Sequence, residues 1–289
     1  MKRISLLAKV SALLGVAIMV SSCVSIGKTQ KRDKDVEYPE TLHTLDLETG
    51  PQHYAIRQTT ASEKAPLLFF VHGSPGTWDG FSGYLRSDSL ASSYEMISVD
   101  RPGFGESRGG KPERSLIVQS ESILEVVKKH KGDRPVILVG HSFGGPVIAQ
   151  IAILAPELID GLVFVAASVD PDLEKKKWFQ VPANWFLFRW MVPQGLDVAN
   201  QEILALKKEL IRMEKDWDKI KTPVSIVHGD KDKLVPIGNV DFMTAHLEHT
   251  SVELFLKEGM NHFVPWNNPQ LLLAGIQSVA ERIADRDNN

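Results

Sequence analysis

The segment Gly140-His-Ser-Phe-Gly144 constrains the fold of this chain more than any other segment. It follows the apolar run Pro135–Val139, which predicts a buried strand, and it precedes Pro146–Ala155, which predicts a helix. A serine placed between a strand and a helix lies on a sharp turn, and only small flanking residues let the two elements cross closely. The two glycines meet this requirement, so the segment predicts a strained turn that exposes the Ser142 hydroxyl.

Other apolar runs of strand length alternate with helical patterns along the chain. We expect strands at 43–48, 53–58, 66–71, 94–99, 161–166, 223–227 and 252–256, a turn at Gly50-Pro51, and helices at 116–129, 200–217 and 269–284. Continuous apolar strands that alternate with helices are typical of a parallel sheet covered on both faces. Ligands of such sheets bind beyond the carboxyl ends of the strands, where the polar motifs of this chain fall.

The composition excludes several classes of function. A net charge of -3 over 289 residues gives no reason to expect a nucleic-acid partner. The segment Gly105–Lys111 resembles a phosphate-binding loop, but Pro112 stands where such a loop needs Ser or Thr for magnesium. The histidines have no metal-ligand spacing, and a single cysteine allows no internal disulfide. We therefore expect neither a metal nor a cofactor.

Residues 1–22 predict a secretory signal peptide with a basic start. Its apolar stretch Val10–Val20 is shorter than the roughly 20 residues that span a bilayer. The segment that ends in Val20-Ser-Ser-Cys23 resembles a bacterial lipoprotein cleavage box. This resemblance implies cleavage before Cys23, lipidation of its sulfur and new amine, and a stable membrane anchor. The alternative is an ordinary secreted protein with one free thiol.

The residues that follow Cys23 refine this expectation. Val24 stands where an aspartate would retain a lipoprotein at the inner membrane, so resemblance to enterobacterial sorting favours the outer membrane, facing the periplasm. Residues 23–40 are largely polar and predict a flexible tether between the lipid anchor and the folded part of the chain.

A serine hydroxyl needs a base to accept its proton and an acid to orient the base. After Ser142, the segment His228–Pro236 offers Asp230 and Asp232, and Gly259–Phe263 offers His262. With these motifs in this order, the chain resembles the α/β-hydrolase superfamily.

The resemblance implies a role for each of these residues. In that family the acid lies in a Gly-x-x-Asp-x-x-Val-Pro loop, a pattern that Asp232 matches, whereas Asp230 is its competitor in the same loop. Asp170 and Asp172 are a weaker alternative. The resemblance makes Ser142 the nucleophile and His262 the base, although Asn261 replaces the glycine often found before this histidine.

A second set of positions is implied for an oxyanion hole. The segment His72–Gly76 follows an expected strand, as the family's His-Gly loop does, so the backbone N–H groups of Ser74 and Phe143 are expected to face the developing oxyanion. The segment Asp100–Ser107 matches another family landmark, and we expect it to brace neighbouring turns. We expect the side chain of His141 to point away from Ser142.

The resemblance also implies the domain organisation. It predicts an α/β-hydrolase fold, with a mostly parallel eight-stranded sheet and helices on both faces. The expected core comprises residues 41–169 and 222–289, and a small helical cap at 170–221 is inserted before the penultimate strands. Three of the six tryptophans lie within residues 178–190 of this cap. Three interpretations are open: these side chains pack the cap onto the core, line an acyl pocket, or contact lipid.

These expectations describe an enzyme that hydrolyses small-molecule carboxylic esters through an acyl-enzyme intermediate. Alternative uses of the same residues are a proline-iminopeptidase-like aminopeptidase, a lactonase, a carbon–carbon hydrolase, an acyltransferase or a cofactor-free haloperoxidase. A serine at position 142 argues against the dehalogenase and epoxide hydrolase branches, which use aspartate there. The alternative outside enzymes is a catalytically silent envelope lipoprotein that binds a partner or a lipid.

Replacing Cys23 tests the expected anchor. In a bacterial host grown with labelled palmitate, the wild-type chain is expected to incorporate the label and to sediment with membranes. C23S removes the only thiol, so it should lose both properties. A wild-type chain that takes up no palmitate would contradict the lipoprotein assignment.

Overall fold

The computed structural model describes residues 37–107, 109–174 and 193–287. The signal peptide, the Cys23 anchor and the tryptophans of the segment 178–190 lie outside the described residues. Of the expected tether, residues 23–40, the structure describes only residues 37–40.

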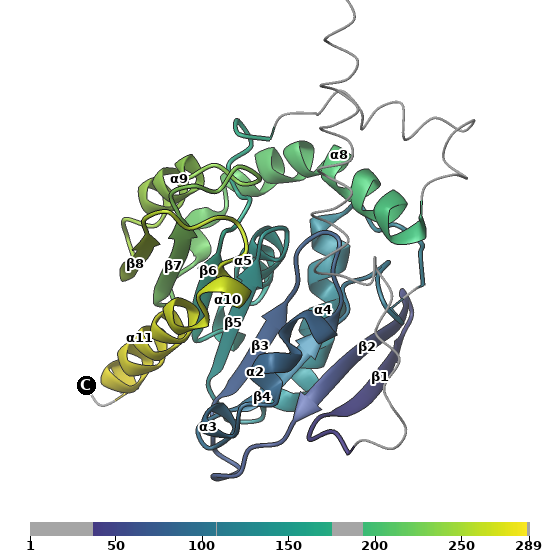
Figure 1. Ribbon diagram of the computed structural model, residues 1–289, viewed down its shortest axis with the longest axis vertical. Helices are drawn as coiled ribbons and strands as arrows, with labels where there is room; N and C mark the ends of the chain where they lie inside the picture. Colours follow the sequence, from purple (N-terminus) through teal and green to yellow (C-terminus); the bar gives the residue numbers. More distant parts are fainter. Residues whose placement is uncertain (1–36, 108, 175–192, 288–289) are drawn as a thin grey trace, which may run out of the picture.

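One eight-stranded sheet forms the centre of the molecule, in the order β1-β2-β4-β3-β5-β6-β7-β8 (Figure 1). The first two strands pair antiparallel with their neighbours, and all later pairs are parallel. The strands are β1 (Thr41–Leu47), β2 (Gly50–Arg57), β3 (Leu67–Val71), β4 (Glu95–Val99), β5 (Val136–His141), β6 (Gly161–Val165), β7 (Val224–Gly229) and β8 (Val252–Lys257).

Helices cover both faces of this sheet (Figure 1). The longer helices are α4 (Leu116–Lys131), α5 (Gly144–Leu154), α8 (Gln194–Glu214), α9 (Gly238–His246) and α11 (Pro269–Asp287). Short elements are η1 (Trp78–Phe81), α2 (Ser82–Leu85), α3 (Asp88–Ala91), η2 (Pro156–Leu158), η3 (Trp217–Lys219) and α10 (Val264–Asn267).

The alternation of side chains along each strand divides the core into two layers. Leu67, Phe69 and Val71 of β3 pack in the layer that contains α4, α5, α8 and α9. Leu68 and Phe70 pack in the opposite layer, which contains η1, α2, α10 and α11. All five of these side chains are fully buried, as an apolar strand with both faces covered requires.

The sequence places most elements within a few residues of their observed bounds, with two differences. The two strands expected around Gly50-Pro51 do pair, but their turn lies at residues 48–49, because Gly50 and Pro51 already pair with β1 as the first residues of β2. The helix expected from residue 200 begins earlier, at Gln194, directly after Pro193. Helix α8 is the longest element in the described part of the segment that the sequence assigns to a cap, and it runs along one end of the sheet (Figure 1).

The register of the central strands brings their carboxyl ends to one level. Val71 at the end of β3 pairs with Gly140, and His141 at the end of β5 pairs with Val165. The loops that follow β3, β5 and β6 therefore start beside one another, which is the edge where the candidate residues lie.

Gly140 sits where β5 and α5 approach closely. A Cβ at this position would lie 2.5 Å from the backbone oxygen of Gly144 and 2.9 Å from Cγ1 of Ile148. Any larger residue would force the strand and the helix apart, so the geometry explains why glycine stands before the Ser142 turn.

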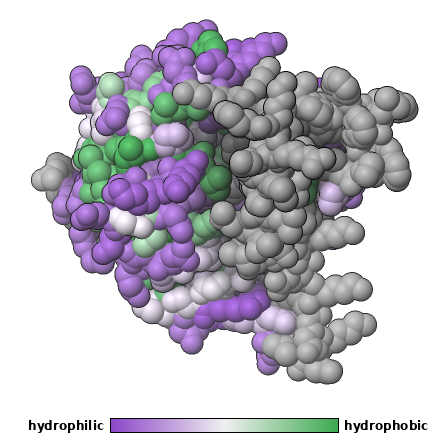
Figure 2. Space-filling view, turned by 45° about the horizontal axis from the view of Figure 1, so that its top comes forward, coloured by the Kyte–Doolittle hydropathy of each residue, from purple (hydrophilic) through white to green (hydrophobic). Residues whose placement is uncertain are grey.

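Figure 2 shows one face of the molecule. The described residues on this face form hydrophobic patches that lie between hydrophilic residues. Exposed large apolar side chains include Leu234 and Trp266, which neighbour the candidate site in sequence. Within the described ranges, no helix combines the length and the apolar character needed to cross a membrane.

Replacing Gly140 tests the close crossing of β5 and α5. G140A should lower the free energy of unfolding by about 1–3 kcal/mol, the usual cost of overpacking a core. The control is G83A in α2, where an added Cβ meets nothing within 4 Å and is expected to be neutral or slightly stabilising. Urea denaturation of both variants checks this, and equal stabilities would contradict it.

Candidate active site

Ser142 lies at the turn between β5 and α5 with a φ of 54°, in the left-handed region that residues with a Cβ rarely occupy. Its backbone N–H donates to Val165 O at 2.9 Å, and its carbonyl accepts from the N–H groups of Gly145 and Ser168 at 3.0 and 3.2 Å. The end of β6 therefore holds the strained turn from both sides. Ser142 itself is only partly buried.

Asp232 and His262 come together from the loops that follow β7 and β8. The Nδ1 group of His262 lies 2.6 Å from Oδ2 of Asp232, and both residues are buried. The other carboxylate oxygen accepts the N–H groups of Leu234 and Val235 at 2.8 and 2.9 Å. With both oxygens bound, the carboxylate has a fixed orientation toward the histidine ring.

These contacts also decide the charge of Asp232. Burial alone would raise the pKa of this carboxyl, but the hydrogen bond and charge of His262 and the two N–H donors outweigh it. The pKa of Asp232 is therefore lowered below its usual value, and the side chain is ionised at neutral pH.

The competing carboxylates lie elsewhere. Asp230 accepts the backbone N–H of Gly259, in the loop after β8, at 2.6 Å and pairs with Lys231. Asp170 accepts the N–H of Asp172, and Asp172 faces Lys207 on α8 at 3.5 Å. Of the four candidate acids, the structure places Asp232 against His262.

His141 connects the serine turn to the histidine loop. Its Nε2 group donates to the backbone carbonyl of His262 at 3.1 Å, and the two ring centroids are 4.8 Å apart. Trp266 of α10 packs edge-on against His141 at 5.0 Å. Among the described contacts of His262, no hydrogen bond to the Ser142 hydroxyl occurs, so the loops are joined through His141.

The expected direction of His141 leaves out its contact with the histidine loop. The His141 side chain points away from the serine hydroxyl, as expected, and it points toward the loop that carries His262. The sequence signal for this contact was weak, because the two residues lie 121 positions apart. Burial lowers the pKa of His141 to about 3, so the ring stays neutral beside His262.

The loop after β3 packs directly on the serine turn. A Cβ on Gly73 would lie 2.9 Å from Cβ of Ser142, so only glycine allows this approach. Ser74 follows, and its Oγ is buried without a hydrogen-bond partner among the described residues. Phe143 on the other side is the N-cap residue of α5, where backbone N–H groups have no partner within the helix. Phe143 therefore adjoins Ser142 in the chain, and Ser74 follows the glycine that packs on Ser142.

His72 shapes this loop instead of carrying protons. Its Nδ1 group donates to Gly73 O at 2.7 Å, and its Nε2 accepts the backbone N–H of Arg101 at 2.9 Å. Burial, and after it the charge of Arg101, lowers the pKa of His72 well below its usual value. The ring is neutral, in the tautomer that these two hydrogen bonds require.

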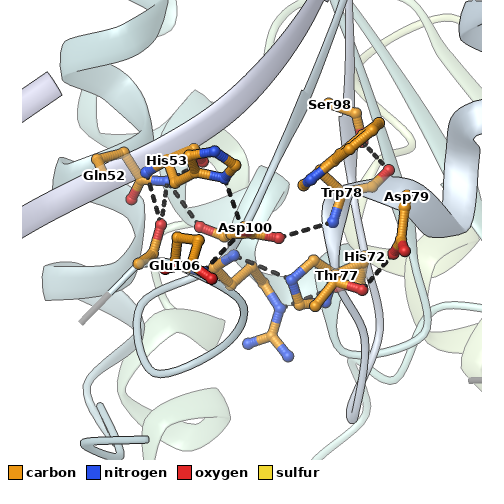
Figure 3. A network of polar contacts seen from close by, with 11 residues as sticks. Gln52, His53, His72, Thr77, Trp78, Asp79, Ser98, Asp100 and Glu106 are labelled. Carbon is orange, nitrogen blue, oxygen red and sulfur yellow. Dashed lines mark hydrogen bonds and ion pairs between the residues drawn. The ribbon is translucent and has the colours of Figure 1, made fainter. Parts of the chain in front are cut away.

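Asp100 joins the same region to the edge of the sheet (Figure 3). Figure 3 shows His53 of β2 pointing toward its carboxylate, which it meets at 2.9 Å, while the backbone N–H of Trp78 approaches from the other side at 2.8 Å. Gln52 donates to the carbonyl of Asp100 at 2.6 Å. Asp100 is a structural anchor for the turns on both sides, as its motif predicts.

The described residues contain no group of three or more His, Cys, Asp and Glu side chains that could hold a metal ion. The chemistry available at this site is that of a serine hydroxyl, a carboxylate–histidine pair and backbone N–H groups, which together suit transfer of an acyl group.

Comparison with known proteins agrees with this architecture. The family described as alpha/beta hydrolase fold matches residues 66–191. A solved structure of a membrane phospholipase A, described as a bacterial virulence factor, superimposes with a TM-score of 0.62 at 20% identity, covering 98% of this chain and 99% of that one.

Three curated proteins are similar to this chain in sequence, and their names give different activities. Epoxide hydrolase 1 of Caenorhabditis elegans is 26% identical over 62% of this chain, which spans only 44% of that protein. The mitochondrial palmitoyl-protein thioesterase ABHD10 of Bos taurus is 24% identical, covering 76% of this chain and 75% of the thioesterase. Proline iminopeptidase PfmaB of Pestalotiopsis fici is 24% identical, covering 76% of this chain and 93% of that one.

The low pKa of His141 predicts a specific pH dependence of stability. Between about pH 6.5, where a free histidine titrates, and the folded value of about 3, the unfolded chain binds a proton that the folded chain excludes. Acidification through this window therefore favours unfolding.

H141Q removes this titration while keeping a donor for the His262 carbonyl. The slope of unfolding free energy against pH should fall by up to about 1.4 kcal/mol per pH unit between about pH 6 and pH 4. Urea denaturation at a series of pH values measures this slope. An unchanged slope in H141Q would show that His141 does not exclude the proton.

Proposed function

Because this chain has the α/β-hydrolase fold, we propose that it is a serine hydrolase that cleaves carboxylic esters through an acyl-enzyme intermediate. Ser142 is the nucleophile, His262 the base and Asp232 the acid that orients it. The backbone N–H groups of Ser74 and Phe143 form the oxyanion hole.

The observation that carries this proposal is the 2.6 Å hydrogen bond between the buried Asp232 carboxylate and His262 Nδ1. A carboxylate on Nδ1 fixes the tautomer in which Nε2 is free to accept a proton. His141 joins the His262 loop to the strained turn of Ser142, which supports the assignment of His262 as the base for this serine.

In acylation, Ser142 Oγ bonds to the acyl carbon while its proton moves to His262 Nε2. The carbonyl electron pair moves onto oxygen, where the two backbone N–H groups stabilise the negative charge. As the carbonyl reforms, the bond to the alcohol breaks, and the alcohol leaves with the proton from His262. Asp232 stabilises the imidazolium that exists between these steps.

In deacylation, a water molecule replaces the alcohol. His262 takes a proton from the water as its oxygen bonds to the acyl carbon, and it returns this proton to Ser142 Oγ as the acyl–serine bond breaks. The neutral His141 ring matters here, because a second positive charge beside His262 would disfavour the imidazolium.

The lipid anchor at Cys23 is part of the proposal for location. We propose that the chain is held at the bacterial outer membrane, facing the periplasm, with the folded part carried on the tether 23–40. The Val20-Ser-Ser-Cys23 box and the apolar stretch before it support this location.

An aminopeptidase that uses the same residues is the second candidate. The segment His72-Gly-Ser-Pro-Gly76 resembles the loop of proline iminopeptidases, and one curated relative carries that name. Rates on esters of increasing acyl length and on aminoacyl amides separate the two: an esterase prefers the esters at every chain length, and an iminopeptidase prefers N-terminal prolyl amides.

Substitutions in the acid loop test the assignment of roles. S142A should lower kcat for an activated ester by about 10⁶-fold and D232N by about 10⁴-fold. D230N is the matched control in the same loop, because an asparagine oxygen can still accept the Gly259 N–H, and it should remain within about twofold of wild type. Ester turnover and labelling by a fluorophosphonate probe measure both effects.

Two results would contradict the proposal. One is probe labelling of S142A to the wild-type level, which would place the nucleophile elsewhere. The other is a wild-type chain that neither turns over any ester, thioester or amide nor takes up the probe, which would favour a non-catalytic lipoprotein.

A further inference from the structure

Arg101 holds the backbone that leads into Ser74. Its Nε and Nη2 groups donate to the carbonyl oxygens of His72 and Gly73, each at 2.9 Å. Its own backbone N–H donates to Nε2 of His72 at 2.9 Å. One residue in the loop after β4 therefore holds the backbone immediately before the proposed oxyanion donor, the N–H of Ser74.

The same guanidinium contacts the other side of the proposed oxyanion hole. Its Cζ atom lies 4.5 Å from the ring centroid of Phe143, a cation–π contact, and 4.9 Å from the ring centroid of Phe104. Phe143 carries the second proposed N–H donor. Arg101 thus contacts Phe143 and the Gly73 carbonyl, which shares a peptide group with the Ser74 N–H, although it reaches no reacting atom itself.

Helix α8 supplies the carboxylate that neutralises Arg101. The Nη1 and Nη2 groups donate to the two carboxylate oxygens of Glu202, each at 2.8 Å. Both side chains are completely buried. Gln119 of α4 also accepts from Nη1, at 2.7 Å, but it is neutral. A buried guanidinium without its carboxylate is strongly disfavoured, so the orientation of the Arg101 fork depends on Glu202.

We infer that Glu202 is a positioning residue for the oxyanion hole and acts through Arg101. This inference rests on the proposed function and adds that α8, which the sequence assigns to the cap, also sets the geometry of the site beneath it. Without the carboxylate, the guanidinium is free to turn, and its bonds to His72 and Gly73 weaken. The N–H of Ser74 then loses its alignment with the oxyanion, while ground-state substrate binding is retained.

E202Q tests the inference with E209Q as its matched control. Glu209 is a second buried glutamate of α8, but it accepts the N–H of Leu116 at the start of α4 and pairs with Arg212. For an activated ester, E202Q should lower kcat by at least about tenfold, toward the roughly 10²–10³-fold cost of a lost oxyanion donor, with KM unchanged. E209Q should retain the wild-type kcat.

Two further readouts separate positioning from general loss of structure. Inhibition by an arylboronic acid, whose tetrahedral anion occupies the oxyanion site, should weaken in E202Q in proportion to kcat, and E202D should recover most of both. Hydrogen exchange of the backbone of residues 72–76 and 100–107 should speed up in E202Q and not in E209Q, whether or not the chain turns over an ester.

The outcomes are distinguishable. Equal kcat, boronate inhibition and exchange in E202Q and E209Q would overturn the positioning role even if the wild type is an active esterase. A wild type without turnover or probe labelling would overturn the proposed function, and the exchange comparison would still decide whether Glu202 holds the loop. If E202Q does not fold, E202D and R101K are compared instead. R101K keeps the positive charge but loses the two-pronged hydrogen bonds to Glu202. A lower kcat in R101K than in E202D supports the inference, and equal kcat values overturn it.

Discussion

The left-handed backbone of Ser142 is the constraint on which the rest of the structure depends. A non-glycine residue in this conformation costs of the order of 1–3 kcal/mol, so it persists only where its surroundings leave no alternative. Here the end of β6 binds the turn through backbone hydrogen bonds, and Gly140 lets α5 lie directly on β5. Gly73 brings the neighbouring loop against the serine. The buried strands beneath supply the rigidity that keeps this turn in place.

Around this turn, the polar residues are arranged so that charge is confined to a few groups. Asp232 is ionised because His262 and two backbone N–H groups stabilise its carboxylate. His141 and His72 are kept neutral chiefly by burial, which leaves them as hydrogen-bond donors and acceptors with fixed tautomers. The positive charge of Arg101 is neutralised by Glu202. A charge that develops on substrate or on His262 therefore meets fixed partners and not competing ions.

Local patterns predict the apolar strands and the α/β fold, because each strand is a short apolar run. The resemblance to the family favours Asp232 over Asp230, and in the structure Asp232 is the one that lies against His262. Sequence reasoning failed where a contact depends on residues far apart in the chain. His141 binds the backbone of His262, which lies 121 positions away, and Arg101 binds Glu202, which lies 101 positions away. No sequence pattern predicts either contact. The first turn was misplaced because Gly50-Pro51 is a turn signal that also fits the start of an antiparallel strand.

A crystal structure of the chain after reaction with an alkyl fluorophosphonate tests the central assignment most directly. We predict a covalent bond between phosphorus and Ser142 Oγ, with one phosphoryl oxygen about 2.7–3.1 Å from the backbone N–H groups of both Ser74 and Phe143. His262 should lie beside the adduct with its bond to Asp232 intact. Phosphorus on another residue, or a phosphoryl oxygen that faces neither N–H group, would contradict the nucleophile and the oxyanion hole together.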